Sequence, residues 1–180
     1  KMDSGSILIG GEAVTVSGPK DAISKGISMI HQELNPVLDM EVAENIFIGR
    51  ERVKTVAGKL KLVDKASMRE ETEELFRGMN ISINPKAVMR YLSVAETQLV
   101  EIVKAISLKS KIVIMDEPTS AITEKEVQVL FEQIERLKGQ GVAIIYISHK
   151  MDEIFKIADQ ITVLRDGALA GSGAAAELDG

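Results

Sequence analysis

The 180-residue sequence contains no cysteine and no tryptophan, and aromatic residues make up only 3% of it. Without cysteine, the chain has neither a disulfide framework nor a thiolate zinc site. The scarcity of aromatic rings argues against the base-stacking surfaces that bind single-stranded nucleic acid. A net charge of −5 argues further against a general nucleic-acid binder, which carries a basic surface. The purely apolar runs are far shorter than a membrane span.

The remaining composition is that of a globular domain, with 45% hydrophobic and 27% charged residues. A chain of this length and composition forms one domain with a real core. Within it, segment 111–120 stands out, because an apolar run leads directly into Asp116 and Glu117, followed by Pro118. Such a run predicts a strand buried on both faces of a parallel sheet. The two carboxylates then lie at its carboxyl end, where open α/β sheets bind their ligands.

The second half of the chain alternates between helical and strand patterns. Ser93 and Glu96 form a capping box at the start of one helix, and residues 123–126 form a second box at the start of another. An apolar strand at 142–147 is followed by Ser148 and His149 at its carboxyl end. A helix at 151–158 then leads to a strand at 161–165. This alternation predicts an α/β fold with a parallel, helix-covered sheet and right-handed crossovers.

We expect three parts in the chain. Residues 1–39 contain a β-hairpin around Gly10 and Gly11, followed by a short strand at 27–30. Residues 40–91 show apolar positions at helical spacing and no strand-like run, which predicts a small inserted helical subdomain. Residues 92–180 return to the sheet. The carboxyl ends of parallel strands share one edge, so Asp116, Glu117 and His149 are expected to meet there.

Groups of this kind suit the hydrolysis of a nucleotide phosphate. That reaction needs a carboxylate for Mg²⁺, a base that orients water and a polar contact to the γ-phosphate. Taken singly, each candidate has an ordinary structural explanation: Glu117 in a solvated turn, His149 as a helix cap, Ser93 in a capping box. Their joint occurrence in one order favours the functional interpretation.

Four segments together resemble a known family. Segment 112–120 resembles a Walker B strand with its catalytic glutamate and the start of the D-loop, and segment 92–96 resembles the ABC signature. Residues 31–33 resemble the Q-loop, and residues 148–149 resemble the switch-histidine segment. The sequence therefore resembles the ATPase domains of ABC transporters, and most nearly the first ATPase domain of bacterial ribose/galactose-type sugar importers. The fold that this implies is a P-loop NTPase-like parallel sheet with flanking helices, an N-terminal hairpin and a helical subdomain.

The resemblance implies ATP and Mg²⁺ as cofactors and gives each residue a role. Asp116 would hold Mg²⁺, and Gln32 would sense it and couple to the membrane subunit. Glu117 would polarise the attacking water, and His149 would contact the γ-phosphate.

The signature segment would serve the opposite site of a head-to-tail pair of ATPase domains. There Ser93 would cap the γ-phosphate with its hydroxyl and its helix N-terminus. Glu96 stands where the family has glutamine, and Ser120 belongs to the D-loop, so both join the expected nucleotide-binding set. The segment departs from the common LSGGQ form, because Val94 and Ala95 replace both glycines.

The sequence has no G-x-x-x-x-G-K-[ST] segment, the loop that cradles nucleotide phosphates. We expect that the chain starts just downstream of its own loop. These residues alone would then bind ATP weakly or not at all, and they would self-associate through apolar faces left uncovered.

The implied partners are transmembrane permease subunits, docked at the Q-loop and the helical subdomain, and a second ATPase domain of the same protein. A sugar-binding protein would act indirectly, and no nucleic acid would bind. The implied location is the cytoplasmic face of a bacterial cell membrane. Two alternatives stay open: an ABC ATPase of DNA repair or translation, and a non-catalytic domain that only couples to a membrane subunit.

Overall fold

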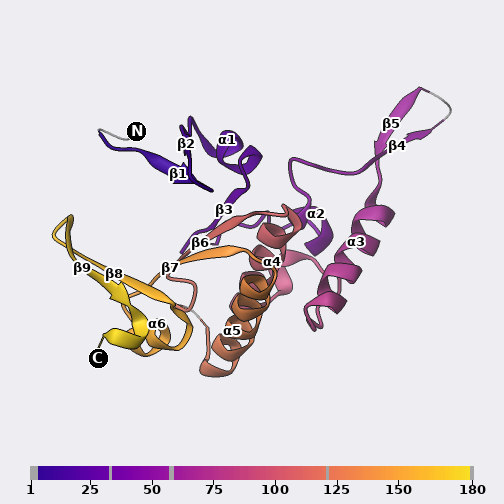
Figure 1. Cartoon of the computed structure of the whole chain (residues 1–180). Helices are drawn as coiled ribbons and strands as arrows, with labels where there is room; N and C mark the ends of the chain where they lie inside the picture. Colours follow the sequence, from indigo (N-terminus) through magenta and orange to yellow (C-terminus); the bar gives the residue numbers. More distant parts are fainter. Residues whose placement is uncertain (1–3, 33, 57–58, 121, 179–180) are drawn as a thin grey trace.

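A three-stranded parallel sheet lies at the centre of the molecule. The computed structural model describes residues 4–32, 34–56, 59–120 and 122–178 (Figure 1). Strands β3 (Ile27–Ile30), β6 (Ile112–Asp116) and β7 (Ala143–Ile147) pair in the order β3-β6-β7. Ile30 is the register partner of Met115, which in turn is the partner of Tyr146. The three predicted strands therefore end together at one edge of the sheet.

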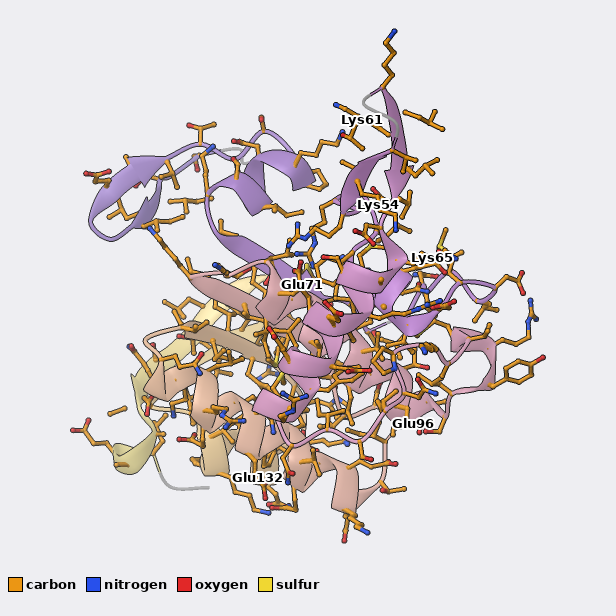
Figure 2. The ribbon with its side chains drawn as sticks, turned by 90° about the vertical axis from the view of Figure 1, so that its right-hand side faces the viewer. Lys54, Lys61, Lys65, Glu71, Glu96 and Glu132 are labelled. Atoms are coloured by element: carbon orange, nitrogen blue, oxygen red, sulfur yellow. The ribbon has the colours of Figure 1, made fainter. Side chains whose placement is uncertain are left out.

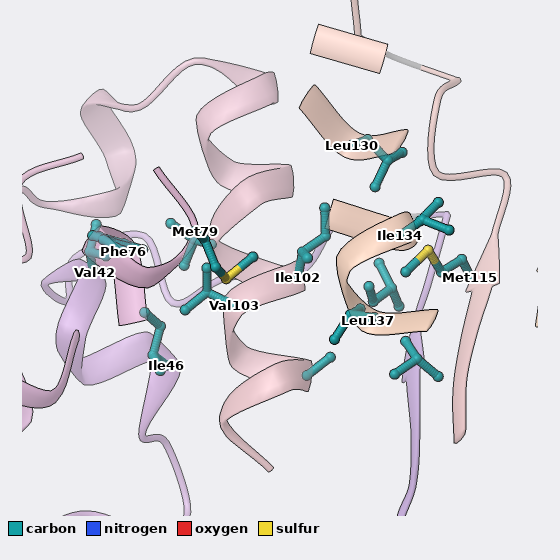
Figure 3. Packing of buried hydrophobic residues seen from close by; sticks show 14 of the residues in the cluster. Val42, Ile46, Phe76, Met79, Ile102, Val103, Met115, Leu130, Ile134 and Leu137 are labelled. Atoms are coloured by element: carbon teal, nitrogen blue, oxygen red, sulfur yellow. The ribbon is translucent and has the colours of Figure 1, made fainter. Parts of the chain in front are cut away.

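Two long helices, α4 (Val94–Ser107) and α5 (Glu124–Gly139), cover one face of this sheet (Figure 1). Each begins with the predicted capping box, and in α4 the backbone N–H of Glu96 donates to Ser93 Oγ at 3.2 Å. The apolar stripe of α5 packs against Met115 of β6 (Figure 3). All five of its predicted members are buried: Val127, Leu130, Phe131, Ile134 and Leu137.

The other face of the sheet is open, so the prediction that the strands are buried on both faces is wrong. Val113 and Met115 are at most 1% exposed, whereas Ile145 and Ile147 on the neighbouring strand are 48% and 46% exposed. Met29 of β3 is also exposed. Side chains alternate between the two faces of a strand, and only the face toward α4 and α5 is covered in the described part of the chain.

The inserted segment contains helices but also a hairpin that the sequence analysis missed. Helices α2 (Val42–Ile46) and α3 (Lys65–Gly78) and the short 3-10 helix η1 (Met89–Tyr91) occupy it, and α2 and α3 pack with α4. Between them, β4 (Val53–Val56) and β5 (Leu60–Val63) form an antiparallel pair. The pair projects from the body with all eight residues exposed, and Lys54 and Lys61 lie on it (Figure 2). Neither face is buried, and the alternation of lysine and leucine at residues 59–62 is the one short signal of a strand that the sequence analysis passed over.

The N-terminal hairpin matches its prediction. Strands β1 (Ile7–Ile9) and β2 (Glu12–Val14) pair in antiparallel register. Gly10 and Gly11 have φ of +60° and +86°, the left-handed values that a tight hairpin turn requires. Helix α1 (Pro19–Ser24) then leads into β3.

The C-terminal part departs from the predicted alternation. After α6 (Met151–Ile157), strand β8 (Gln160–Arg165) pairs antiparallel with β9 (Ala168–Ala174), and the short 3-10 helix η2 (Ala175–Glu177) follows. Within the described residues β8 does not join the parallel sheet, so the expectation of a continued parallel arrangement is wrong. In the described part of the chain, no helix has both the length and the apolar character needed to cross a membrane.

Candidate active site

The carboxyl edge of the parallel sheet collects the predicted catalytic residues. Gln32 follows β3 by two residues, Asp116 ends β6 and Glu117 follows it, and His149 lies two residues beyond β7. Because Ile30, Met115 and Tyr146 are in register, the chain segments that follow them leave the sheet side by side.

Glu117 and His149 are in direct contact. His149 Nδ1 lies 2.8 Å from Glu117 Oε1, within hydrogen-bond distance. The Glu117 side chain is 17% exposed, whereas that of His149 is 78% exposed. The second carboxylate oxygen of Glu117, Oε2, is buried and has no hydrogen-bond partner among the described residues. It is therefore a buried acceptor that the described residues leave unsatisfied.

The backbone presents Glu117 in an unusual conformation. Its φ is +46°, in the left-handed region that costs a non-glycine residue about 1–2 kcal/mol. Its N–H donates to the carbonyl of Ile147 at 2.9 Å, and its own carbonyl accepts from the exposed Ser120 N–H at 3.1 Å. These bonds join the turn after β6 to the end of β7. Strain of this kind persists only where the surroundings determine the conformation.

Asp116 and Gln32 lie at the same edge, and within the described residues neither side chain is hydrogen-bonded to Glu117 or His149. Asp116 is half-buried and Gln32 is exposed. Among the described residues, no group of three or more His, Cys, Asp or Glu side chains could hold a metal ion. Carboxylate and amide oxygens nevertheless suit Mg²⁺, which protein sites often bind through one or two carboxylates together with substrate phosphates and water. Asp116 and Gln32 fit that incomplete ligand set.

The signature residues lie at the N-terminus of α4, away from this contact. The Ser93 N–H and hydroxyl donate to Glu96 Oε2 at 2.8 and 2.9 Å. In the described part of the chain, no hydrogen bond links either residue to Glu117 or His149, so the structure does not bring the two groups together. Of the segments quoted above, Glu33 lies outside the described residues, as does the D-loop residue at 121.

The sequence analysis missed a polar network beside the site. Thr119 and Tyr146 donate to Glu153 Oε2 at 2.7 and 2.8 Å, and Lys150 Nζ lies 3.2 Å from Glu153 Oε1. Two signals were available: Tyr146 is the one residue with a polar side chain in its apolar strand, and Lys150 and Glu153 have the i, i+3 spacing of a helical ion pair.

Comparison with known proteins identifies the family. A family model described as "ABC transporter" matches residues 1–120. The chain belongs to the ABC transporter family. A galactose/methyl galactoside import ATP-binding protein of Photobacterium profundum is 55% identical over 171 residues, covering 95% of this chain and 34% of that protein. A protein of Halalkalibacterium halodurans, named for ribose/galactose/methyl galactoside import, is 54% identical over 178 residues, covering 99% and 34%. The chain thus spans about a third of the length of these curated relatives.

Solved structures of the ABC transporter family show the same fold. A nucleotide-free ATP-binding cassette superposes with a TM-score of 0.81 at 22% identity, over 97% of this chain and 71% of that one. A cassette in its ADP conformation gives a TM-score of 0.78 at 22% identity, over 96% and 70%. The predicted family and the predicted α/β fold class are both confirmed.

Proposed function

We propose that the protein carrying this chain is the ATP-binding and ATP-hydrolysing subunit of a bacterial ABC importer that powers the uptake of a ribose- or galactose-like sugar. The 2.8 Å contact between Glu117 and His149 is the observation that carries this proposal. This contact supports the proposal, because a carboxylate and an imidazole at the carboxyl edge of an open α/β sheet lie where such folds bind their ligands. Relatives at 55% and 54% identity are named for the import of such sugars.

Each residue contributes a defined action to the reaction. Glu117 accepts a hydrogen bond from the attacking water, which orients the water for in-line attack. His149, which the Glu117 carboxylate holds in place, contacts the γ-phosphate. Asp116 and Gln32 would hold Mg²⁺, which would neutralise phosphate charge.

The signature residues act on a neighbouring site. Ser93 and the N-terminus of α4 are exposed, and a helix N-terminus favours phosphate oxygens. They would serve the nucleotide of a second ATPase domain in the same protein, together with Glu96 and the D-loop residue Ser120.

The permease would dock beside the helical subdomain. A cavity of about 480 Å³ opens between α2, α3, α4 and α5. Its walls combine apolar side chains with charged groups of both signs, among them Phe47, Leu75, Met79, Lys109, Arg136 and Glu74. An amphipathic helix fits a groove of this kind. Gln32 lies on the Q-loop that would couple this docking to hydrolysis, and the sugar-binding protein would act only through the permease.

This arrangement assigns a role to each part of the chain. Residues 1–39 and 92–180 form the core of one ATPase domain, and residues 40–91 form its helical subdomain. The protein would work as a peripheral subunit on the cytoplasmic face of the membrane.

The test is ATP hydrolysis by the full-length protein and by its Glu117→Gln variant. We expect the variant to lose at least about a hundredfold in kcat, because a positioned general base contributes that much. Glu135→Gln removes an exposed carboxylate on α5 and is the control with unchanged activity. If Glu117→Gln leaves hydrolysis intact, this half of the protein is a non-catalytic coupling domain. If the protein hydrolyses ATP but membrane vesicles containing its permease take up no sugar, a non-transport ABC ATPase is the better assignment.

A further inference from the structure

We infer that Glu153 is a positioning residue, which fixes the spacing between Glu117 and His149 by tying together the two chain segments that carry them. This inference rests on the proposed hydrolysis, to which it adds a residue that touches neither nucleotide nor water.

The Glu153 carboxylate is the acceptor shared by three other side chains: Thr119, Tyr146 and Lys150. Its Oε2 accepts from Thr119 Oγ1 at 2.7 Å and from the Tyr146 hydroxyl at 2.8 Å. Its Oε1 lies 3.2 Å from Lys150 Nζ. The same ammonium donates to the carbonyl oxygen and to Oγ1 of Thr119, both at 3.1 Å. Three elements therefore converge on one side chain of α6: the turn after β6, the strand β7, and the residue before α6.

The network is largely shielded from water. Thr119 is 1% exposed, and the Glu153 side chain is 12% exposed. Burial raises the pKa of Glu153, but the hydrogen bonds from Thr119 and Tyr146 and the Lys150 ammonium outweigh it and hold that pKa below its ordinary value. Burial, followed by the bond to Glu153, raises the pKa of Tyr146, so its hydroxyl keeps its proton and donates. The ionised Glu153 carboxylate can therefore accept the hydrogen bonds that the protonated Tyr146 hydroxyl and the Lys150 ammonium donate.

The network adjoins the catalytic pair on both sides. Thr119 lies two residues after Glu117, and Lys150 directly follows His149. The His149 ring is mostly exposed, and among the described residues its one hydrogen bond is to Glu117. Its position therefore depends on the backbone that carries it. Glu117, at φ +46°, equally needs a fixed turn behind it.

Two pairs of substitutions separate positioning from packing. Glu153→Ala removes both carboxylate acceptors, whereas Glu153→Gln keeps the shape and one acceptor oxygen. Thr119→Val removes only the hydroxyl at nearly constant volume, whereas Thr119→Ser retains it. We expect kcat to fall about tenfold in Glu153→Ala and Thr119→Val, because small misplacements of reacting groups are costly. Thr119→Ser should stay within about twofold of wild type, and Glu153→Gln should lie between the extremes.

The experiment measures kcat and KM for ATP with the full-length protein. Asp152→Asn, on the same turn of α6, removes an exposed carboxylate and is the matched control. KM should change by less than about twofold in every variant, because the network does not touch the nucleotide. The inference is overturned if Glu153→Ala and Thr119→Val keep the wild-type kcat, or if Thr119→Ser loses as much as Thr119→Val.

A second readout does not require hydrolysis. The [13Cε1]-histidine resonance of His149, assigned with His149→Gln, reports the contact with Glu117. We expect Glu153→Ala to shift and broaden this resonance and Asp152→Asn to leave it unchanged; an unchanged signal in Glu153→Ala overturns the inference. If wild-type protein hydrolyses no ATP, the proposed function fails, and the His149 resonance still decides whether Glu153 positions the pair.

Discussion

Replacing Glu117 with Gln is expected to stabilise the chain while it abolishes hydrolysis. The wild-type carboxylate is poorly placed for stability, because its side chain is only 17% exposed and Oε2 has no partner among the described residues. Among the described residues, its one side-chain hydrogen bond goes to His149, which is 78% exposed. A cost of this kind is expected of a residue that serves activity rather than stability.

The change in the free energy of unfolding is the balance of two opposed effects. A buried charged oxygen without a partner costs about 1–3 kcal/mol, and a neutral amide in the same place costs less. The contact with an exposed imidazole contributes about 0–1 kcal/mol, which the substitution removes in part. The backbone strain at φ +46° is common to both side chains and cancels. We therefore expect Glu117→Gln to raise the free energy of unfolding by about 1 kcal/mol.

The assay is urea unfolding of the 180-residue chain, followed by far-ultraviolet circular dichroism. Glu135→Gln, in an exposed ion pair with Lys138, is the control and should change stability by less than about 0.5 kcal/mol. A Glu117→Gln variant that is less stable than wild type would refute the reasoning. It would mean that the stabilisation from the hydrogen bond to His149 exceeds the free-energy cost of burying the carboxylate.

Three further predictions concern the framework of the site. Leu130→Ala should lower the free energy of unfolding by about 3 kcal/mol, because Leu130 is 1% exposed in the core between α5 and the sheet. Urea unfolding checks this against Tyr91→Ala, which alters a residue that is 82% exposed. Ser93→Ala removes the N-cap of α4 and should cost about 1 kcal/mol in the same assay; no loss would mean that solvent replaces the cap. The ionised Asp21 carboxylate should stabilise the fold, and this stabilisation should disappear in acid. The Lys25 ammonium, followed by Ser17, lowers the pKa of Asp21 from 3.8 to about 2. A lowered pKa stabilises the fold above pH 3.8, and this contribution is lost as the pH falls from 3.8 toward 2. Wild type and Asp21→Asn should therefore differ at pH 5 and converge near pH 2, and a constant difference would contradict this.

Local patterns predicted the elements that local physics determines. The capping boxes at Ser93 and Thr123, the apolar stripe of α5 and the glycine turn of the first hairpin all have signals within a few residues. The alternation of helices and strands predicted that Glu117 and His149 meet at one edge of the sheet, which the structure shows as a contact.

The features that the sequence analysis missed depend on tertiary structure. The hairpin β4–β5 buries neither face, and its only periodic signal is the short alternation at residues 59–62. The open face of β7 and the separation of β8 from the parallel sheet depend on which elements lie nearby, not on the composition of the strands. The network at Glu153 joins side chains from three elements, and no spacing along the chain indicates that Thr119 and Glu153 touch.

The register of β3 with β6 also constrains the order of folding. Ile27 pairs with Ile112, so the whole helical subdomain and α4 lie between the two strands in the chain. During synthesis, β3 therefore leaves the ribosome long before its hydrogen-bonding partner, with Met29 and Ile30 uncovered. Contacts between distant segments form slowly, and unpaired apolar strands aggregate while they wait. The sheet that carries the catalytic pair is thus a late product of folding, and its assembly is the step at which chaperones have most to protect.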